Sequence, residues 1–168
     1  MNTNADKKVF FLKKELKKKI KQFKRAGKKI VFTNGCYDII HVGHIRLLKK
    51  AAAMGDVLVV ALNSDSSVRK IKGPSRPLTP QKERAELLAS FYFVDAVTVF
   101  YEENPYNIIK EIKPDVLVKG GDWEIKDIIG ADIVRAGGGR VRSIKYEKGK
   151  STTNIIKKIM KSLSLIHI

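Results

Sequence analysis

The chain has 168 residues, 43% of them hydrophobic, and a formal net charge of +17 at pH 7. This length is typical of one domain with a real core, and the hydrophobic content excludes a disordered chain. No apolar run reaches the roughly 18 residues of a membrane-spanning helix, and the beginning MNTNADKK lacks the features of a secretory signal. Because Cys36 is the only cysteine, no internal disulfide can form. We therefore expect a cytoplasmic protein without a membrane partner.

The positive charge is concentrated near the beginning of the chain. Residues 1–29 contain 11 Lys and one Arg against one Asp and one Glu, so they carry +10 of the total charge. Apolar residues in this segment recur at spacings of three and four: Val9, Leu12, Leu16, Ile20 and Phe23. This stripe predicts that residues 1–28 form a basic amphipathic helix, ending near Gly27, that packs on a domain formed by residues 29–168. A helix that lies on a membrane or on RNA is the alternative.

From residue 29 onward, short β-branched runs alternate with helical patterns. KIVFTNG (29–35) is the first predicted strand, and HIRLLKKAAAMG (44–55) is a helix that Gly55 is placed to close with a left-handed cap. DVLVVALNSD (56–65) follows as a second strand, nearly all apolar, as a strand covered on both faces must be. This order predicts parallel strands joined by crossover helices.

The next elements repeat the alternation. Thr79 and Pro80 resemble an N-cap followed by proline at the first helical position, which opens a helix at QKERAELLASF (81–91). AVTVF (96–100) is the third predicted strand, NPYNIIKEI (104–112) a helix and DVLVKGG (115–121) the fourth strand.

The last third of the chain completes the pattern. GADIVRAGG (130–138) predicts a short helix, RVRSI (140–144) a fifth strand and STTNIIKKIMKSL (151–163) a C-terminal helix. The fold class that we predict is α/β, a single Rossmann-like domain with about five parallel strands and helices on both faces.

Polar and glycine-rich residues follow every predicted strand: TNGCYDIIHVGH, NSD, YEEN, KGGDW and YEKGKSTT. In a parallel sheet, ligands bind outside the carboxyl ends of the strands, where the strand order reverses. The residues that precede the strands mostly lack such polar and glycine-rich clusters. The sequence therefore predicts an active-site rim at the carboxyl edge of the sheet.

His41 and His44 in this rim admit three interpretations. A metal site needs three or four ligands, and the only other histidine, His167, lies at the far end of the chain. Packing in a core does not explain why Gly43, which permits close approach to the backbone, lies between them. In the third interpretation the imidazoles donate hydrogen bonds to phosphate oxygens at a helix amino terminus. We favour the third and expect no metal bound by protein side chains.

The stretch GCYDIIHVGH resembles the G-x-F-D-x-x-H-x-G-H signature of the nucleotidyltransferase superfamily, which includes cytidylyltransferases and pantetheine phosphate adenylyltransferase. Five further stretches are together similar to the adenylyltransferase domain of bacterial ADP-heptose synthases: VALNSD, KGPSRPLTPQKERAELL, FVDAV, IKPDVLVKGGDW and KGKSTTNIIKKI. The resemblance covers residues from about 10 to 161. It implies that residues 29–168 join ATP and D-glycero-β-D-manno-heptose 1-phosphate into ADP-heptose, with release of pyrophosphate, for the inner core of lipopolysaccharide.

The resemblance also implies roles for individual residues. His41, His44 and Lys72 would be catalytic and would stabilise charge on the reacting phosphates. The nucleotide or phosphate would be bound by Thr33, Asn34, Gly35, Asp38, Gly43, Arg84, Lys119, Gly120, Asp122, Ser151, Thr152 and Thr153. Lys72 lies in KIKGPSRP, which we predict to be a mobile loop, and its alternative is a solvated lysine. The alternative for Arg84 is a surface arginine.

Three of these assignments keep alternatives. Asp38 would either orient the histidines or lie near a magnesium ion. The hydroxyls of Ser151–Thr153 would hold the β- and γ-phosphates, although a simple helix cap explains them too. Trp123, beside Asp122, would touch the ribose or base, unless its indole lies in the core.

The implied cofactor is Mg²⁺, held mainly by phosphates and water. The implied partners are ATP and heptose 1-phosphate, with a separate heptose kinase in the same pathway and a possible homodimer, but no nucleic acid. One rival is a cytidylyltransferase that acts on glycerol 3-phosphate, because GDWE and STTNI resemble that relative too. The other is a basic nucleic-acid binding protein, which the net charge would favour.

Overall fold

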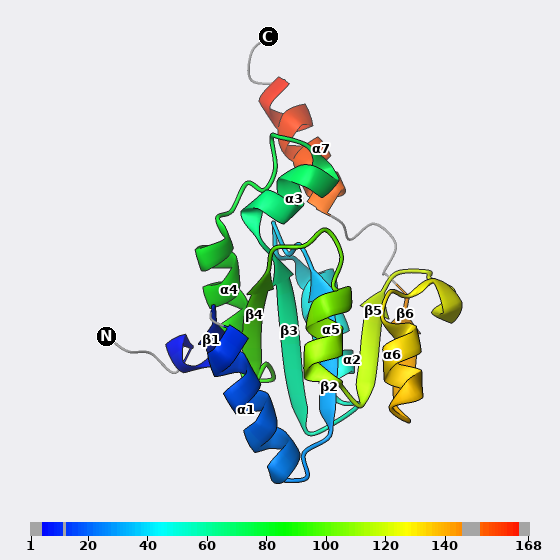
Figure 1. Ribbon diagram of the computed structural model, residues 1–168. Helices are drawn as coiled ribbons and strands as arrows, with labels where there is room; N and C mark the ends of the chain where they lie inside the picture. Colours follow the sequence, from blue (N-terminus) through cyan, green and yellow to red (C-terminus); the bar gives the residue numbers. More distant parts are fainter. Residues whose placement is uncertain (1–4, 12, 146–151, 165–168) are drawn as a thin grey trace.

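The computed structural model describes residues 5–11, 13–145 and 152–164 (Figure 1). Within these residues, six parallel strands form one sheet in the order β1-β4-β3-β2-β5-β6. The strands are β1 (Val9–Phe10), β2 (Ile30–Gly35), β3 (Val57–Asn63), β4 (Ala96–Phe100), β5 (Val116–Gly120) and β6 (Arg140–Ile144). The predicted fold class is confirmed, with one strand more than the five expected.

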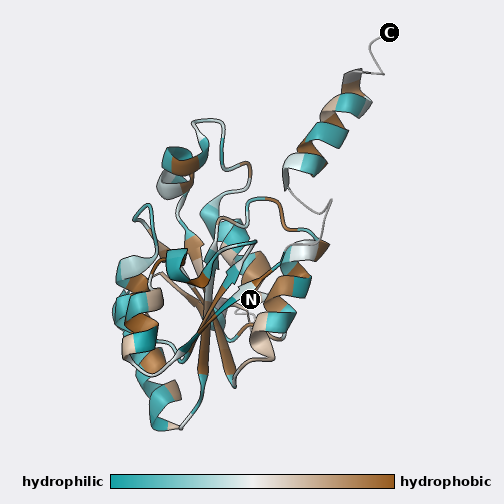
Figure 2. Cartoon of the chain, turned by 90° about the vertical axis from the view of Figure 1, so that its right-hand side faces the viewer, coloured by the Kyte–Doolittle hydropathy of each residue, from teal (hydrophilic) through white to brown (hydrophobic). Residues whose placement is uncertain are grey.

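Helices cover both faces of the sheet, as Figures 1 and 2 show. They are α1 (Lys13–Arg25), α2 (Val42–Ala52), α3 (Asp65–Lys72), α4 (Gln81–Ala89), α5 (Tyr106–Ile112), α6 (Ala131–Ala136) and α7 (Thr152–Ser164), with short 3₁₀ turns at Asp6–Lys8 and Ile125–Asp127. Buried side chains of α1, α5 and α6 form one core with the sheet, and those of α2 and α4 form a second core on the other face. Among the described residues no helix has the length and apolar character needed to cross a membrane.

The beginning of the chain differs from the single predicted helix. Val9 and Phe10 form β1, which pairs with Val97 and Thr98 of β4, and the helix begins only at Lys13. The hydroxyl of Thr98 also donates to the Phe10 carbonyl at 3.0 Å. Without β1, β4 would be an unprotected sheet edge, and a short edge strand removes that liability. Two residues are too few to interrupt a helical pattern of spacings, so the sequence did not reveal this strand.

The predicted role of Gly55 as a left-handed helix cap is wrong. The C-cap of helix α2 is Ala53, whose φ is −67°, and Gly55 is not in the left-handed region. A Cβ at Gly55 would instead lie 2.6 Å from Val31 Cγ2 and 2.7 Å from the Lys29 carbonyl oxygen. The chain needs glycine here because two backbones approach closely, a contact that the local pattern does not show.

Helix α3 was not predicted, and it changes the place of Lys72. The Ser64 hydroxyl caps this helix by accepting from the Ser67 N–H at 3.1 Å, and Gly73, with φ 96°, ends it. Lys72 is therefore the last residue of a helix and not part of a loop, which begins at Gly73. Only Ser67 and Val68 of α3 are buried, so its apolar periodicity is too weak to identify a helix. Helix α4 begins at Gln81, with Pro80 at the cap position predicted for Thr79.

Candidate active site

The candidate site lies at the carboxyl ends of β2 and β5, where the strand order reverses. From β2 the chain moves to β3 and β4 on one side, whereas β5 and β6 lie on the other. A hollow of about 40 Å³ opens there, lined by Thr33, Asn34, Gly35, Tyr37, His44, Leu47, Lys119 and Gly120. A second hollow of about 80 Å³ shares Asn34 and Lys119 with the first and adds Pro105, Trp123, Asp127, Ile128 and Ile129. Six of the predicted site residues therefore meet in the first hollow.

The two histidines form a stacked pair at the amino end of α2. Their ring centroids are 3.9 Å apart and their planes differ by 23°. The ring centroids of His44 and Tyr37 are 5.2 Å apart, in an edge-to-face arrangement. The His41 backbone N–H donates to His44 Nδ1 at 3.4 Å. Because Nδ1 accepts this bond, a neutral His44 carries its proton on Nε2. The pair is half-buried, so packing in a core does not describe it.

Both imidazoles are held in the neutral form. Burial, with smaller contributions from the positive charges of His41 and Lys72, lowers the pKa of His44 from 6.5 to about 4. Burial also lowers the pKa of His41. Two stacked imidazolium ions would repel each other, which is a further reason for neutrality. Near pH 7 each ring therefore offers one N–H donor and acts as a hydrogen-bond donor to an anion rather than as a fixed cation.

Lysines approach the same place from two elements. Lys119 on β5 is half-buried in both hollows, and this burial lowers its pKa. Lys72 at the end of α3 is exposed, yet its charge acts to lower the pKa of both His44 and the Cys36 thiol. Burial raises the pKa of the Cys36 thiol, although Lys72, Arg84 and Lys119 oppose that shift. The thiol is therefore protonated near pH 7 and is not an activated nucleophile.

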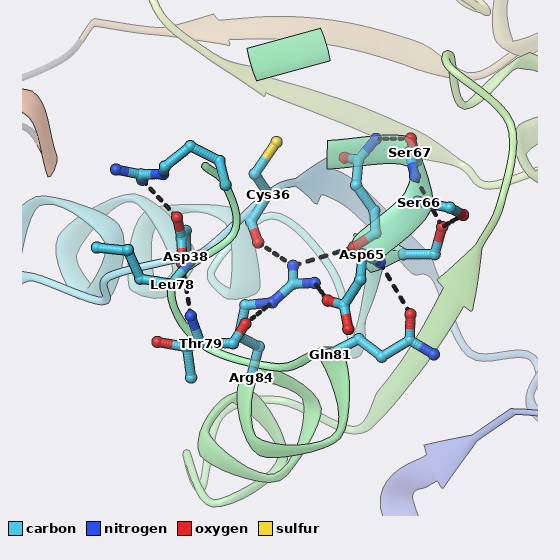
Figure 3. A network of polar contacts seen from close by, with 12 residues as sticks. Cys36, Asp38, Asp65, Ser66, Ser67, Leu78, Thr79, Gln81 and Arg84 are labelled. Carbon is cyan, nitrogen blue, oxygen red and sulfur yellow. Dashed lines mark hydrogen bonds and ion pairs between the residues drawn. The ribbon is translucent and has the colours of Figure 1, made fainter. Parts of the chain in front are cut away.

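Arg84 is the centre of a buried polar network, shown in Figure 3. Its side chain is fully buried. Nε donates to the Thr79 carbonyl at 2.8 Å, and Nη1 donates to the carbonyls of Asn63, at 3.0 Å, and of Cys36. Nη2 donates to the Asp65 carboxylate. These bonds join the ends of β2 and β3 to the beginnings of α3 and α4.

This placement corrects the prediction for Arg84. The side chain is neither a surface arginine nor aimed at a phosphate, because its donors end on protein acceptors. It positions the rim instead of binding the substrate. The sequence contained a signal for this: Arg84 lies four residues before Leu88 on the buried face of α4.

Asp38 is also buried and holds the segment that follows α3. One carboxylate oxygen accepts from the N–H groups of Leu78, at 2.7 Å, and Thr79, at 3.0 Å, and the other forms an ion pair with Arg76. The carboxylate therefore links residues 76–79 to the turn between β2 and α2. Neither predicted role, orienting the histidines or binding magnesium, accounts for these contacts, and sequence reasoning had not considered Arg76.

The predicted glycines lie at this turn for different reasons. A Cβ at Gly35 would lie 3.0 Å from the ring of Tyr37, so Gly35 leaves room for that ring. Tyr37 itself has a φ of 47°, in the left-handed region that few non-glycine residues adopt. Gly43 lies in the first turn of α2, between the histidines.

The remaining predicted residues surround the hollows. Trp123 is exposed and lines the second hollow, so its indole lies at the rim and not in the core. Asp122 is exposed on the same turn but lines neither hollow. The hydroxyl of Thr152, at the beginning of α7, donates to the Ile39 carbonyl at 3.3 Å, which brings this helix beside the histidine turn. Thr153 is exposed, and Ser151 lies outside the described residues.

A sequence model of the cytidylyltransferase-like family matches residues 32–158, a range that contains all the site residues named above. The chain belongs to this family. The nucleotidyltransferase superfamily expected from GCYDIIHVGH, and the expectation of an enzyme, are thereby confirmed.

Curated relatives extend the similarity beyond the family. The chain is 51% identical over 161 residues to the bifunctional protein HldE of Aliarcobacter butzleri, covering 96% of this chain and 32% of the relative. It is 48% identical over 149 residues to the HldE of Syntrophotalea carbinolica, covering 89% of this chain and 30% of the relative. The chain thus spans about a third of the length of these relatives.

Solved structures support the fold. A lipopolysaccharide core biosynthesis protein from Thermoplasma volcanium matches with a TM-score of 0.61 and 27% identity, covering 74% of this chain and 100% of that one. The pantoate-beta-alanine ligase of Francisella tularensis, complexed with beta-gamma ATP and beta-alanine, matches with a TM-score of 0.53 over 83% of this chain and 67% of that one. At 16% identity the ligase shows the fold alone.

Proposed function

We propose that the chain transfers the adenylyl group of ATP to D-glycero-β-D-manno-heptose 1-phosphate, giving ADP-heptose and pyrophosphate for the inner core of lipopolysaccharide. Identity of about half to HldE proteins over most of the chain supports this substrate pair. The similar protein of Thermoplasma volcanium is named for lipopolysaccharide core biosynthesis, which supports the same area of metabolism.

The observation that carries the proposal is the neutral, stacked pair of His41 and His44 beside Lys119 at the reversal of strand order. In the reaction an oxygen of the sugar phosphate forms a bond to the α-phosphorus, and the bond from that phosphorus to the pyrophosphate oxygen breaks. Both reactants are already ionised, so no side chain has to remove a proton. What the reaction needs is alignment and donors for the charge that builds on the α-phosphate oxygens. Imidazole N–H groups and Lys119 supply these.

We propose that Mg²⁺ is held mainly by the phosphates and water. Among the described residues no group of three or more His, Cys, Asp or Glu side chains is placed to hold a metal ion. The carboxylate of Asp38, for which magnesium was one predicted role, already contacts Arg76 and two backbone N–H groups. When bound with ATP, the ion would neutralise charge on the leaving pyrophosphate.

The test is Mg²⁺-dependent release of pyrophosphate with ATP or CTP, offered with heptose 1-phosphate, glycerol 3-phosphate or no acceptor. We expect turnover with ATP and heptose 1-phosphate alone. Turnover with CTP and glycerol 3-phosphate would instead support the alternative substrate pair, which the name of the matched family favours. No release of pyrophosphate with any pair would reject nucleotidyl transfer. Salt-sensitive binding of nucleic acid would then be the property to measure.

We also propose that this enzyme works in the cytoplasm as a homodimer and acts in the same pathway as a heptose kinase. The relatives are named bifunctional, which supports a second activity in that pathway. Light scattering coupled to gel filtration tests the dimer, since a mass near the 18.9 kDa of one chain would reject it.

A further inference from the structure

A groove of about 790 Å³ opens at the amino edge of the sheet, the edge opposite the histidines. It lies between the C-terminal ends of α1, α5 and α6, which are the lower ends of these helices in Figure 1. The segments that lead into β2 and β5 form its base. Its lining residues are Lys24, Gly27, Lys28, Lys29, Tyr106, Lys110, Lys113, Pro114, Asp115, Ile133, Val134, Ala136 and Gly137.

The charge of this lysine groove exceeds what the fold requires. Of the described lining residues, five are lysines and only Asp115 is a carboxylate, and that carboxylate accepts the Ile30 N–H at 2.7 Å. Lysines stabilise helix C-termini, but three C-termini together amount to only about −1.5 charges. With Asp115 and also Asp132, which accepts from Tyr106 beside the groove, included, an excess of about +1.5 charges remains. Neutralisation of helix ends therefore explains only part of the cluster.

One of these lysines, Lys24, links two of the helices that border the groove. Lys24 Nζ reaches from α1 to α5 and donates to the Lys113 carbonyl at 3.1 Å. Lys113 has a φ of 46°, a left-handed conformation that is uncommon outside glycine and is found where the surrounding contacts over-determine it. Burial lowers the pKa of Lys24, and the charge of Lys113 acts in the same direction, against the opposite effect of Asp115. A bound anion would relieve this repulsion.

Apolar and aromatic groups complete the walls. Pro114 and Val134 are buried in the wall of the groove, and Ile133 is half-buried. The hydroxyl of Tyr106, which also lines the groove, donates to the Asp132 carboxylate at 2.9 Å. A groove of this volume falls in the range of sites for small organic ligands. A nucleic acid would need several aromatic platforms, and among the described lining residues Tyr106 is the only aromatic one.

We propose that the lysine groove is a second ligand site, which binds a small phosphorylated metabolite with at least two negative charges. Its phosphates lie on Lys24, Lys28 and Lys110, and its organic part lies against the wall formed by Pro114 and Ile133. The site is separate from the candidate active site, because it occupies the opposite ends of β2 and β5.

Amide chemical shifts of the ¹⁵N-labelled chain, titrated without Mg²⁺ with inorganic tripolyphosphate and separately with ATP, test this proposal. We expect shifts at Gly27–Lys29 and Lys113 that saturate independently of those at Gly35 and His44. Lys28→Glu and Lys110→Glu should each weaken binding at the groove by about tenfold or more. The matched control is Lys50→Glu, because Lys50 is an exposed lysine in the last turn of α2, as Lys110 is in α5. It should change groove affinity by less than about twofold.

The absence of groove shifts at millimolar probe would overturn the proposal, as would an equal loss of affinity in Lys50→Glu. Equal affinity for ATP and tripolyphosphate would overturn the part that places an organic group on the wall. These outcomes are independent of the proposed adenylyl transfer. An inactive chain with an occupied groove would reject only the transfer, and an active chain with an empty groove would reject only the second site.

Discussion

Two clusters of nitrogen donors lie at the same edge of the sheet and differ in whether their N–H groups are bonded to the protein. Arg84 is fully buried, and its donors end on backbone carbonyls and on the Asp65 carboxylate. His41 and His44 stack on each other, and His44 lines an open hollow. N–H groups that donate to protein acceptors stabilise the rim, whereas N–H groups that face a hollow are available to a substrate. The partners of a side chain, more than its type, thus separate the two roles.

Replacing Arg84 by Met should have the largest effect, and the effect should be on stability. Removal of the guanidinium leaves the Asp65 carboxylate and three carbonyls without their donor, which costs about 3–5 kcal/mol. For a chain of this size that lowers Tm by about 6–20 °C, measured by thermal unfolding. Lys82→Met, an exposed change on the same helix, is the control. An unchanged Tm with a large loss of turnover would return Arg84 to the phosphate-binding residues.

Replacing either histidine by Ala should act mainly on catalysis. Loss of a donor to a developing charge costs about a hundredfold or more in turnover, measured by pyrophosphate release. His44→Gln should keep part of the rate, because the amide nitrogen of Gln offers a donor at a similar distance. Near-wild-type turnover in both Ala variants would remove the histidines from the mechanism and end the contrast with Arg84.

Replacing Asp38 by Ala should destabilise the fold by about 2–3 kcal/mol, since two N–H groups lose their acceptor and Arg76 loses its counter-ion. Asp38→Asn keeps one acceptor and should cost less. Urea unfolding measures both changes, and a double-mutant cycle with Arg76→Ala isolates the ion pair. If Asp38→Ala left stability unchanged but weakened activation by Mg²⁺, the carboxylate would belong with the substrate and not with the rim.

The smallest expected effect is a dependence of stability on pH. The folded pKa of His44 is about 4 and its ordinary value is 6.5, so between these values the unfolded chain binds more protons than the folded one. The stability linked to neutral His44 is therefore fully present above pH 6.5 and declines as the pH falls toward 4. Tm measured from pH 7 to pH 5 should fall more steeply in the natural chain than in His44→Gln. Parallel slopes would show that His44 is not held neutral by the fold.

The sequence was sufficient for most of the sheet and for the edge at which the site lies. Strands β2 to β5 contain apolar runs rich in β-branched residues, and the carboxyl ends of parallel strands necessarily share one edge, so Asn34, His44 and Lys119 converge as expected. These features follow from local composition and from the handed geometry of the crossover connections, and both can be read from neighbouring residues.

Other features depend on contacts between residues far apart in the chain. The partners of Arg84 and Asp38, the need for glycine at Gly55 and the edge strand β1 arise where separate segments meet, and no local pattern of spacing contains them. The lysine groove is the clearest case, since its lysines come from the ends of α1 and α5, which only folding brings together. A sequence records which groups are present, but the folded chain determines which of them are satisfied by one another and which remain to bind something else.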